Sequence, residues 1–262
     1  MEPYVLMSQP SPEIVRLTLN RADTYNALSE DMLEALAQAL DAIAQQSDVK
    51  AVILEAMGKA FCAGHDLKQM RASPSQTYYQ KLFERCSEIM LQVQRLPQPV
   101  IAQVQGVATA AGCQLVAMCD LAVASSAAKF AVSGVNLGLF CATPSVALAR
   151  NIARKKAMYL LLTGDFIDAR QAMEWGLVNE VVEPEELSAS TLRLAQKIAQ
   201  KPKTALKMGK QLFYQQVEQP MDVAYGLACQ TMACNMMDDS ALEGVQAFID
   251  KRKPSWSSSQ LS

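Results

Sequence analysis

The sequence predicts an α/β fold in which buried strands alternate with helices, followed by a helical C-terminal region. Three apolar runs rich in β-branched residues read as strands, at 14–19, 51–54 and 100–104. Helical patterns separate them, and from Ala147 onward the chain is mostly helical. Strands alternating with helices are typical of a sheet with both faces covered.

The first strand, Ile14 to Leu19, ends at a polar turn. Ser29 is placed to cap the next helix, whose apolar residues from Met32 to Ala44 recur on one face. A loop of small residues at 58–66 follows the second strand and leads into a polar helical stretch. These signals predict a strand, helix, strand, loop and helix in succession.

The pattern repeats after the third strand. A helix rich in small residues is expected at 110–118 and another strand at 121–124. In the second half, one short apolar run at 177–182 interrupts the helical pattern, and no Gly/Ser-rich linker marks a separate domain. We therefore expect an α/β core over residues 1–195 and a helical region over 196–262.

Composition excludes several classes of partner. Half of the 262 residues are hydrophobic, and 24 basic residues nearly balance 26 scattered acidic ones. This leaves no basic footprint for nucleic acid or an anionic membrane. The apolar stretches are too short to span a bilayer. We expect no nucleic-acid or membrane partner.

Histidine and cysteine usage narrows the chemistry. His65 is the only histidine, so a zinc site with two histidines cannot form within one chain, and we expect no metal. The seven cysteines form no regular framework, which is typical of reduced thiols. Because the N-terminal residues also lack a signal-peptide pattern, we expect a cytoplasmic protein.

Two segments of small residues would let the backbone approach a ligand closely. They are residues 58–67, GKAFCAGHDL, and residues 106–115, GVATAAGCQL. Small residues before a helix leave its first N–H groups free, and two such donors aimed at one carbonyl oxygen would form an oxyanion hole. Taken singly, either segment is explained as well by tight packing.

The order of short motifs along the chain carries a family resemblance. The motifs are Asn26-Ala27-Leu28, residues 61–67, Gly112-Cys113-Gln114-Leu115, Phe130, Asn136-Leu137-Gly138 and the basic run at 251–254. Together they resemble the enoyl-CoA hydratase/isomerase (crotonase) family over essentially the whole chain. The resemblance implies a spiral of β-β-α units, a C-terminal region that assembles a homotrimer or hexamer, and an acyl-CoA thioester partner. Coenzyme A would enter within the substrate, so no separate cofactor is expected.

The resemblance also implies roles for individual residues. The backbone N–H groups of His65 and Ala111 would hold the thioester oxygen and stabilise an enolate. The His65 imidazole would be either a bystander or a hydrogen-bond partner near the thioester. The residues implied in binding the coenzyme A thioester are Ala27, Ala63, Gly64, Asp66, Leu67, Gly112 and Lys251, the last reaching the phosphates in its own or an adjacent subunit.

The two glutamates that hydratases of this family use are missing. By alignment on the neighbouring motifs, Gln114 takes the first position and Gly134 the second, and neither can exchange a proton. A positioned acid or base contributes roughly 10²- to 10⁴-fold, so we expect weak or absent hydratase activity.

Three interpretations stay open. The chain could be a lyase or isomerase of the family, a decarboxylase that needs an oxyanion hole but no base, or a non-catalytic acyl-CoA binding protein. Against the decarboxylase, the tyrosine expected shortly after Gly138 is absent, and Leu139, Phe140 and Cys141 stand there.

Overall fold

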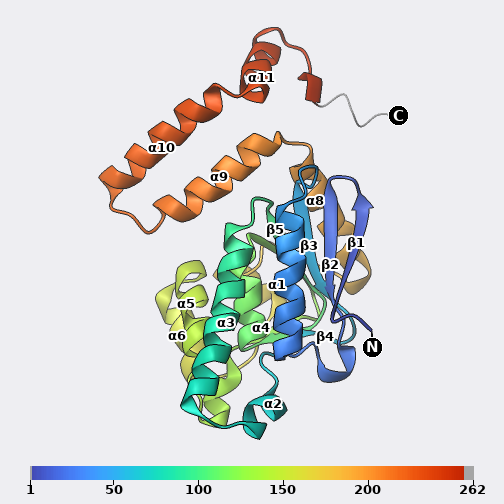
Figure 1. Ribbon diagram of the computed structural model, residues 1–262, viewed down its shortest axis with the longest axis vertical. Coiled ribbons are helices and arrows are strands. Elements are labelled where there is room, and N and C mark those ends of the chain that lie inside the picture. Colours follow the sequence, from blue (N-terminus) through green and yellow to red (C-terminus); the bar gives the residue numbers. More distant parts are fainter. Residues whose placement is uncertain (1, 257–262) are drawn as a thin grey trace.

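The computed structural model describes residues 2–256, which form two sheets covered by helices (Figure 1). The larger sheet has the strand order β1 (Val5–Ser11), β2 (Ile14–Leu19), β3 (Ala51–Ala56), β5 (Val100–Val104), β7 (Leu121–Ser125) and β10 (Glu180–Val182). The smaller sheet has the order β4 (Ala60–Cys62), β6 (Val107–Thr109), β8 (Lys129–Ala131) and β9 (Ile167–Asp168). Only the outer pairs β1–β2 and β8–β9 are antiparallel among these strands.

Three consecutive units build both sheets. In each unit the first strand joins the larger sheet, the second joins the smaller sheet, and a helix follows. The helices are α2 (Leu67–Ala72) and α3 (Gln76–Arg95) after β3–β4, α4 (Ala111–Met118) after β5–β6, and α5 (Ala142–Asn151) after β7–β8. This arrangement confirms the predicted α/β fold and its spiral of β-β-α units.

The remaining helices flank this spiral or extend from it. They are η1 (Ala22–Thr24), α1 (Glu30–Ala44), η2 (Ser133–Leu137), α6 (Arg154–Thr163), α7 (Ala169–Trp175), η3 (Pro184–Glu186), α8 (Leu187–Ala199), α9 (Lys203–Gln216), α10 (Met221–Met236) and α11 (Asp239–Ile249). As expected, Ser29 caps α1 by accepting a hydrogen bond from the Met32 N–H.

Alternation along the strands fills a core on each face of the larger sheet. In β3, Val52 and Leu54 pack into the main core with the apolar face of α1, while Ala51 and Ile53 pack into a second core under α8. Successive side chains of a strand point to opposite faces, so a strand buried on both sides needs an unbroken apolar run.

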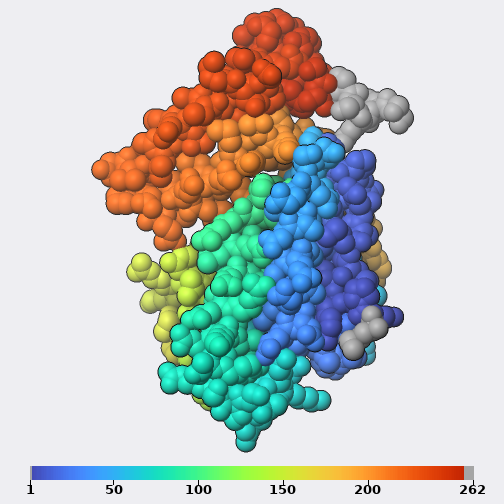
Figure 2. Space-filling model, in the orientation of Figure 1, coloured from blue at the N-terminus to red at the C-terminus, as the bar shows by residue number. Residues whose placement is uncertain are grey.

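The helices α9 to α11 form a C-terminal arm at one end of the molecule, whereas α2 lies at the other end (Figures 1 and 2). The arm is anchored by Lys210, a buried residue of α9. Its Nζ donates to Asp120 Oδ2 at 2.7 Å and to the carbonyl oxygens of Val93 and Gln98, both at 3.0 Å. Tyr214 O–H donates to the other Asp120 oxygen at 2.9 Å. Burial lowers the pKa of Lys210, and Asp120 opposes that shift.

We predict that Lys210→Met destabilises the fold by about 3 kcal/mol, because breaking a buried ion pair leaves its partner charge uncompensated. The exposed Lys207 on the same helix is the matched control, and Lys207→Met should change stability by no more than about 0.5 kcal/mol. Urea unfolding of both variants measures the difference. Equal stability of the two would show that the pair does not hold the arm in place.

Candidate active site

A cavity of about 260 Å³ opens where the loop after β4, the N-terminal end of α4 and the segment 133–144 meet. Apolar side chains make up most of its wall. The lining residues are Ala63, His65, Leu67, Met70, Phe83, Ala110, Ala111, Ser133, Gly134, Leu137, Leu139, Phe140, Cys141, Ala142, Thr143 and Pro144. No lysine, arginine, aspartate or glutamate is among them.

Two backbone segments approach each other closely at this cavity. A Cβ placed on Gly64 would come within 2.9 Å of Ala110 Cβ and 3.3 Å of the Ala111 nitrogen, so the loop carrying His65 lies directly against the start of α4. The N–H groups of His65 and Ala111 donate no backbone hydrogen bond within the described residues. The first N–H groups of a helix have no intrahelical acceptor, which explains why the N–H of Ala111, the first residue of α4, has none.

Gly112 makes this approach possible. A Cβ at Gly112 would lie 2.1 Å from the Cys62 carbonyl oxygen and 2.8 Å from Cys62 Cβ, which no real side chain tolerates. Helix α4 can therefore rest on β4 only if position 112 is glycine. Gly112 does not line the cavity, and its contribution there is to place Ala111.

Ala110, just before α4, has a strained backbone. Its φ of 49° and ψ of −121° belong to a region that glycine occupies most readily, and its N–H donates to the Ala131 carbonyl of β8 at 3.0 Å. Such conformations persist only where the surroundings enforce them. This turn leads directly into Ala111, the first residue of α4, which lines the cavity.

Asn26 fixes the loop on the other side. It is fully buried with φ of 54°, and its Nδ2 donates to the carbonyls of Met57 at 2.8 Å and Ala60 at 2.9 Å. Two further bonds tie the loop of β4 to this turn: Leu28 N–H donates to Gly64 O at 2.7 Å, and Ala63 N–H donates to Tyr25 O at 3.0 Å. Ala27 thus belongs to the support of the cavity and does not line it.

The His65 imidazole lines the cavity beside the ring of Phe83, with centroids 5.4 Å apart and planes at 62°. Both ring nitrogens are shielded from solvent without a well-formed hydrogen bond. Burial lowers the pKa of His65, which favours the neutral ring, and the Leu28 backbone offsets this only in part. Phe83 and Met70 also line the cavity, and the sequence analysis did not single them out.

Gly134 stands where the second carboxylate would be expected, and Cys141 lies against it. A Cβ on Gly134 would come within 2.6 Å of the Leu139 carbonyl oxygen and 2.7 Å of Cys141 Sγ. Burial raises the pKa of the Cys141 thiol, partly opposed by the Gly134 N–H. Position 134 therefore has no room for a larger residue unless the 139–141 segment moves.

The other predicted residues are placed as follows. Ala63 and Leu67 line the cavity. Gln114 is 4% exposed and its Oε1 has no partner, but it is not among the lining residues. Asp66 caps α2 by accepting from the N–H groups of Lys68 and Gln69. Lys251 follows α11 in the C-terminal arm, at the opposite end from α2.

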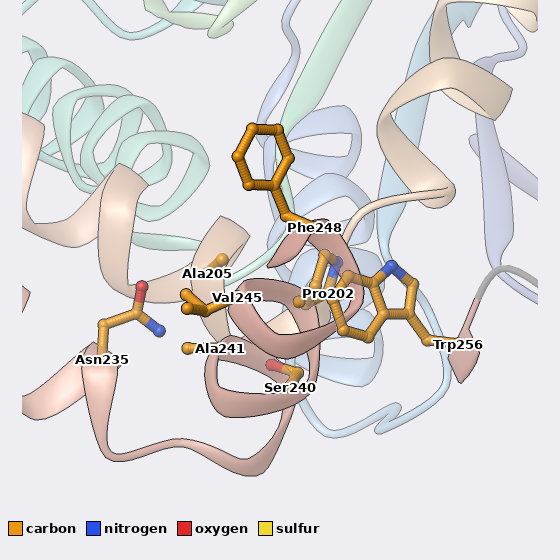
Figure 3. Close-up of a pocket in the computed structure, with 9 residues that line it drawn as sticks. Pro202, Ala205, Asn235, Ser240, Ala241, Val245, Phe248 and Trp256 are labelled. Carbon is orange, nitrogen blue, oxygen red and sulfur yellow. The ribbon is translucent and has the colours of Figure 1, made fainter. Parts of the chain in front are cut away.

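A second cavity, of about 370 Å³, lies within the C-terminal arm (Figure 3). It is walled mainly by small and apolar residues of α9 and α11, and Phe248 projects from it with 85% of its surface exposed. Asn235, Ser240 and the Trp256 indole add polar atoms, but no acidic or basic residue lines it.

The described residues contain neither a cluster typical of a metal site nor a helix typical of a membrane span. No cluster of three or more His, Cys, Asp or Glu side chains is arranged to hold a metal ion within residues 2–256. The same part of the chain contains no helix with the length and apolarity needed to cross a bilayer.

Comparison with known proteins decides the family. The model of the enoyl-CoA hydratase/isomerase family matches residues 10–259. The chain belongs to the enoyl-CoA hydratase/isomerase family. It is 43% identical to mouse enoyl-CoA hydratase domain-containing protein 3, mitochondrial, over 98% of this chain and 85% of the mouse protein. A solved enoyl-CoA hydratase from Mycobacterium smegmatis superposes with a TM-score of 0.96 at 58% identity, covering 97% of this chain and 99% of that one.

The expected cytoplasmic location is contradicted by the relatives. The mouse relative, and a human one that is 43% identical over 95% of this chain and 85% of its own length, are both named mitochondrial. Unpaired cysteines argue only against an oxidising compartment and cannot separate one reducing compartment from another. The prediction of a cytoplasmic protein was therefore wrong.

We predict that Gly112→Ala destabilises the protein by at least about 2 kcal/mol, because the added methyl group overlaps the Cys62 carbonyl. Gly209, in the interior of α9 with open space around it, is the matched control. Gly209→Ala should instead stabilise by up to about 1 kcal/mol. Thermal unfolding of both variants tests this, and a tolerated Gly112→Ala would refute the close contact between α4 and β4.

Proposed function

We propose that this member of the enoyl-CoA hydratase/isomerase family binds an acyl-CoA thioester and stabilises its enolate, with weak or absent hydratase activity. The backbone N–H groups of His65 and Ala111 hold the thioester oxygen. The observation that carries the proposal is a cavity wall with two free backbone donors and no carboxylate.

The juxtaposition of Gly64 with Ala111 supports the oxyanion role, since it brings the segments that carry the two N–H groups close together beside the cavity. Rigid donors aimed at a developing negative charge in a dry site stabilise it by about 3 kcal/mol each. The apolar wall keeps water away, which strengthens this interaction further.

Hydration of a double bond needs proton transfer to and from water, and the wall supplies no carboxylate for it. The Gln114 amide cannot exchange a proton, and Gly134 has no side chain. The carboxylates nearest to the wall on α3, Glu84 and Glu88, are exposed and lie outside the cavity. Glu88 pairs with Arg85. Loss of both acid and base groups accounts for the expected low hydratase activity.

Assembly as a homotrimer, or as a hexamer of two trimers, is part of the proposal. The C-terminal arm exposes large apolar side chains that a monomer would leave in water: Phe213, Val217, Met221, Val223, Tyr225, Met232, Met236, Met237, Leu242, Val245, Phe248 and Ile249. Exposed apolar surface of this extent is typical of a protein interface. Lys251 would then meet the coenzyme A phosphates of an adjacent subunit. The cavity of its own chain is lined by residues of α2, which lies at the end of the molecule opposite the arm.

We predict that the purified protein binds crotonyl-CoA, butyryl-CoA and longer acyl thioesters, yet adds water to crotonyl-CoA at least about 10²-fold more slowly than a hydratase with both glutamates. Calorimetry measures binding, and mass spectrometry follows every thioester species. Ala111→Pro, which removes one donor, should weaken binding, while Ala111→Gly should not.

Each outcome of that panel decides between interpretations. Rapid hydration would refute the disabling role assigned to Gln114 and Gly134. Release of carbon dioxide from methylmalonyl-CoA, added to the same panel, would establish the decarboxylase instead. Binding of all thioesters without any change of mass would leave the non-catalytic binding protein as the function.

We also predict that restoring the glutamates does not restore hydration. Gln114→Glu preserves the side-chain size, but Gly134→Glu places a Cβ against the Leu139 carbonyl and Cys141 Sγ. The double variant should lose thermal stability relative to Gln114→Glu alone and gain no hydratase activity. Efficient hydration of crotonyl-CoA by the double variant would show that the 139–141 segment moves freely.

A further inference from the structure

The end of the C-terminal arm has a lysine at a position whose backbone suits glycine. Lys251 follows α11 with a left-handed backbone, φ 53°. The helices η2, α6 and α7 also run into a left-handed residue, and in each of them it is a glycine, Gly138, Gly164 or Gly176. A Cβ disfavours this conformation, so glycine would fit position 251 with less strain. Strain at a charged, exposed residue points to a role for its side chain.

An ion pair holds the strained turn in place. Arg252 donates from Nη1 and Nη2 to the two carboxylate oxygens of Glu243, at 2.6 Å and 2.9 Å. Glu243 Oε1 also accepts from the Ser255 N–H at 2.7 Å, and the Arg252 N–H donates to the Ala247 carbonyl at 2.9 Å. We call Glu243 and Arg252 the clasp. Two parallel bonds between a guanidinium and a carboxylate fix geometry as well as charge, so the clasp ties the chain after Lys251 back onto α11.

Charge is divided unequally within this turn. The hydrogen bonds from Arg252 lower the pKa of Glu243 to about 2, so its carboxylate stays ionised near neutral pH and balances the guanidinium. Arg252 Nε also lies 3.5 Å from Asp250 Oδ2. The exposed Lys251 ammonium group has no bonded partner among the described residues. An unpaired ammonium group on a fixed turn suits a phosphate, which lysine binds as a point charge.

We propose that Glu243 and Arg252 are positioning residues, which hold the turn at 251–255 so that the Lys251 ammonium group meets the phosphates of an acyl-CoA bound to an adjacent subunit. This inference rests on the proposed function, in which the thioester occupies the cavity and Lys251 reaches the coenzyme. It assigns the placement of that lysine to the clasp. It also explains why a lysine stands where glycine would be less strained.

The first test compares the affinities for butyryl-CoA and for butyryl-pantetheine, which lacks the phosphates and the adenosine. Calorimetry gives the ratio of the two affinities, and the adenosine contributes equally in all variants. Glu243→Gln removes a negative charge from the arm, so a purely electrostatic role would leave the ratio unchanged or raise it. We expect the ratio to fall about fivefold, because Lys251 loses its fixed place. Arg252→Lys keeps the charge but not the parallel bonds, and the ratio should fall in it too.

Further variants separate the lysine from the turn that carries it. Lys251→Ala and Lys251→Gly should both lower the ratio about tenfold, the value of one hydrogen bond to a charged group, with the affinity for butyryl-pantetheine retained. Lys251→Gly should unfold at the higher temperature of the two, because glycine relieves the backbone strain. Lys253→Ala removes another exposed lysine from the same turn and is the matched control, whose ratio should equal that of the wild type.

Sedimentation of each protein at the concentration of the binding assay shows whether its subunits stay assembled. Loss of assembly in both Glu243→Gln and Arg252→Lys would assign the clasp to subunit contact and overturn its positioning role. An unchanged or higher ratio in Glu243→Gln, or an equal loss in Lys253→Ala, would overturn the inference while leaving acyl-CoA binding intact. Failure of the wild type to assemble or to bind butyryl-CoA would overturn the proposed function and the inference together.

Discussion

The site depends on one close approach of main chain to main chain, that of Gly112 to the Cys62 carbonyl. Through it, the first turn of α4 rests on the end of β4, and two segments separated by 50 residues in the sequence present free N–H groups to one cavity. A side chain at position 112 would overlap the Cys62 carbonyl and push α4 away from β4. The rest of the wall, from Phe83 to Pro144, is then arranged around donors whose places are already fixed.

The remaining features of the region hold that approach in place. The side-chain amide of Asn26 donates hydrogen bonds to two carbonyl oxygens at the β3–β4 turn, and these bonds hold the turn beside the chain at Ala27. Ala110 keeps a conformation that suits glycine better, supported by its bond to Ala131. Strain of this kind is stored where a backbone group must point in a set direction. In contrast, a Cβ placed on Gly209 of α9 would meet no atom within 4 Å.

Much of the fold could be predicted from the sequence. Strongly patterned segments were predicted correctly. They are the strands at 14–19 and 100–104 and the helix capped by Ser29. The strands of the smaller sheet escaped, since β4, β6 and β8 have three residues each and β9 has two. A run of two or three residues shows no periodicity in the sequence. Its pairing with neighbouring strands is set by the spiral of β-β-α units. The exposed strand β1 was missed because its sequence includes Pro10 and polar residues that resemble a loop.

The candidate site was predictable only in part, for a related reason. Small residues at 63–64 and 110–112 are visible in a sequence, but the φ of Ala110 and the packing of Phe83 on His65 arise from contacts between distant segments. The cellular compartment could not be predicted, because cysteine usage indicates only whether a compartment is oxidising or reducing.

A hydratase site needs two kinds of group, one that stabilises negative charge and one that moves protons. In the function proposed for this chain, the two have separated. The charge-stabilising part is main chain, so it persists through almost any side-chain replacement that spares Gly64 and Gly112. The proton-moving part is side chain, and here it is an amide at position 114 and a hydrogen at position 134, the latter enclosed by Leu139 and Cys141. A fold that builds its oxyanion hole from backbone can thus lose one reaction and keep its ligand. The wall that remains is mostly apolar, and its polar side chains are those of His65, Ser133, Cys141 and Thr143.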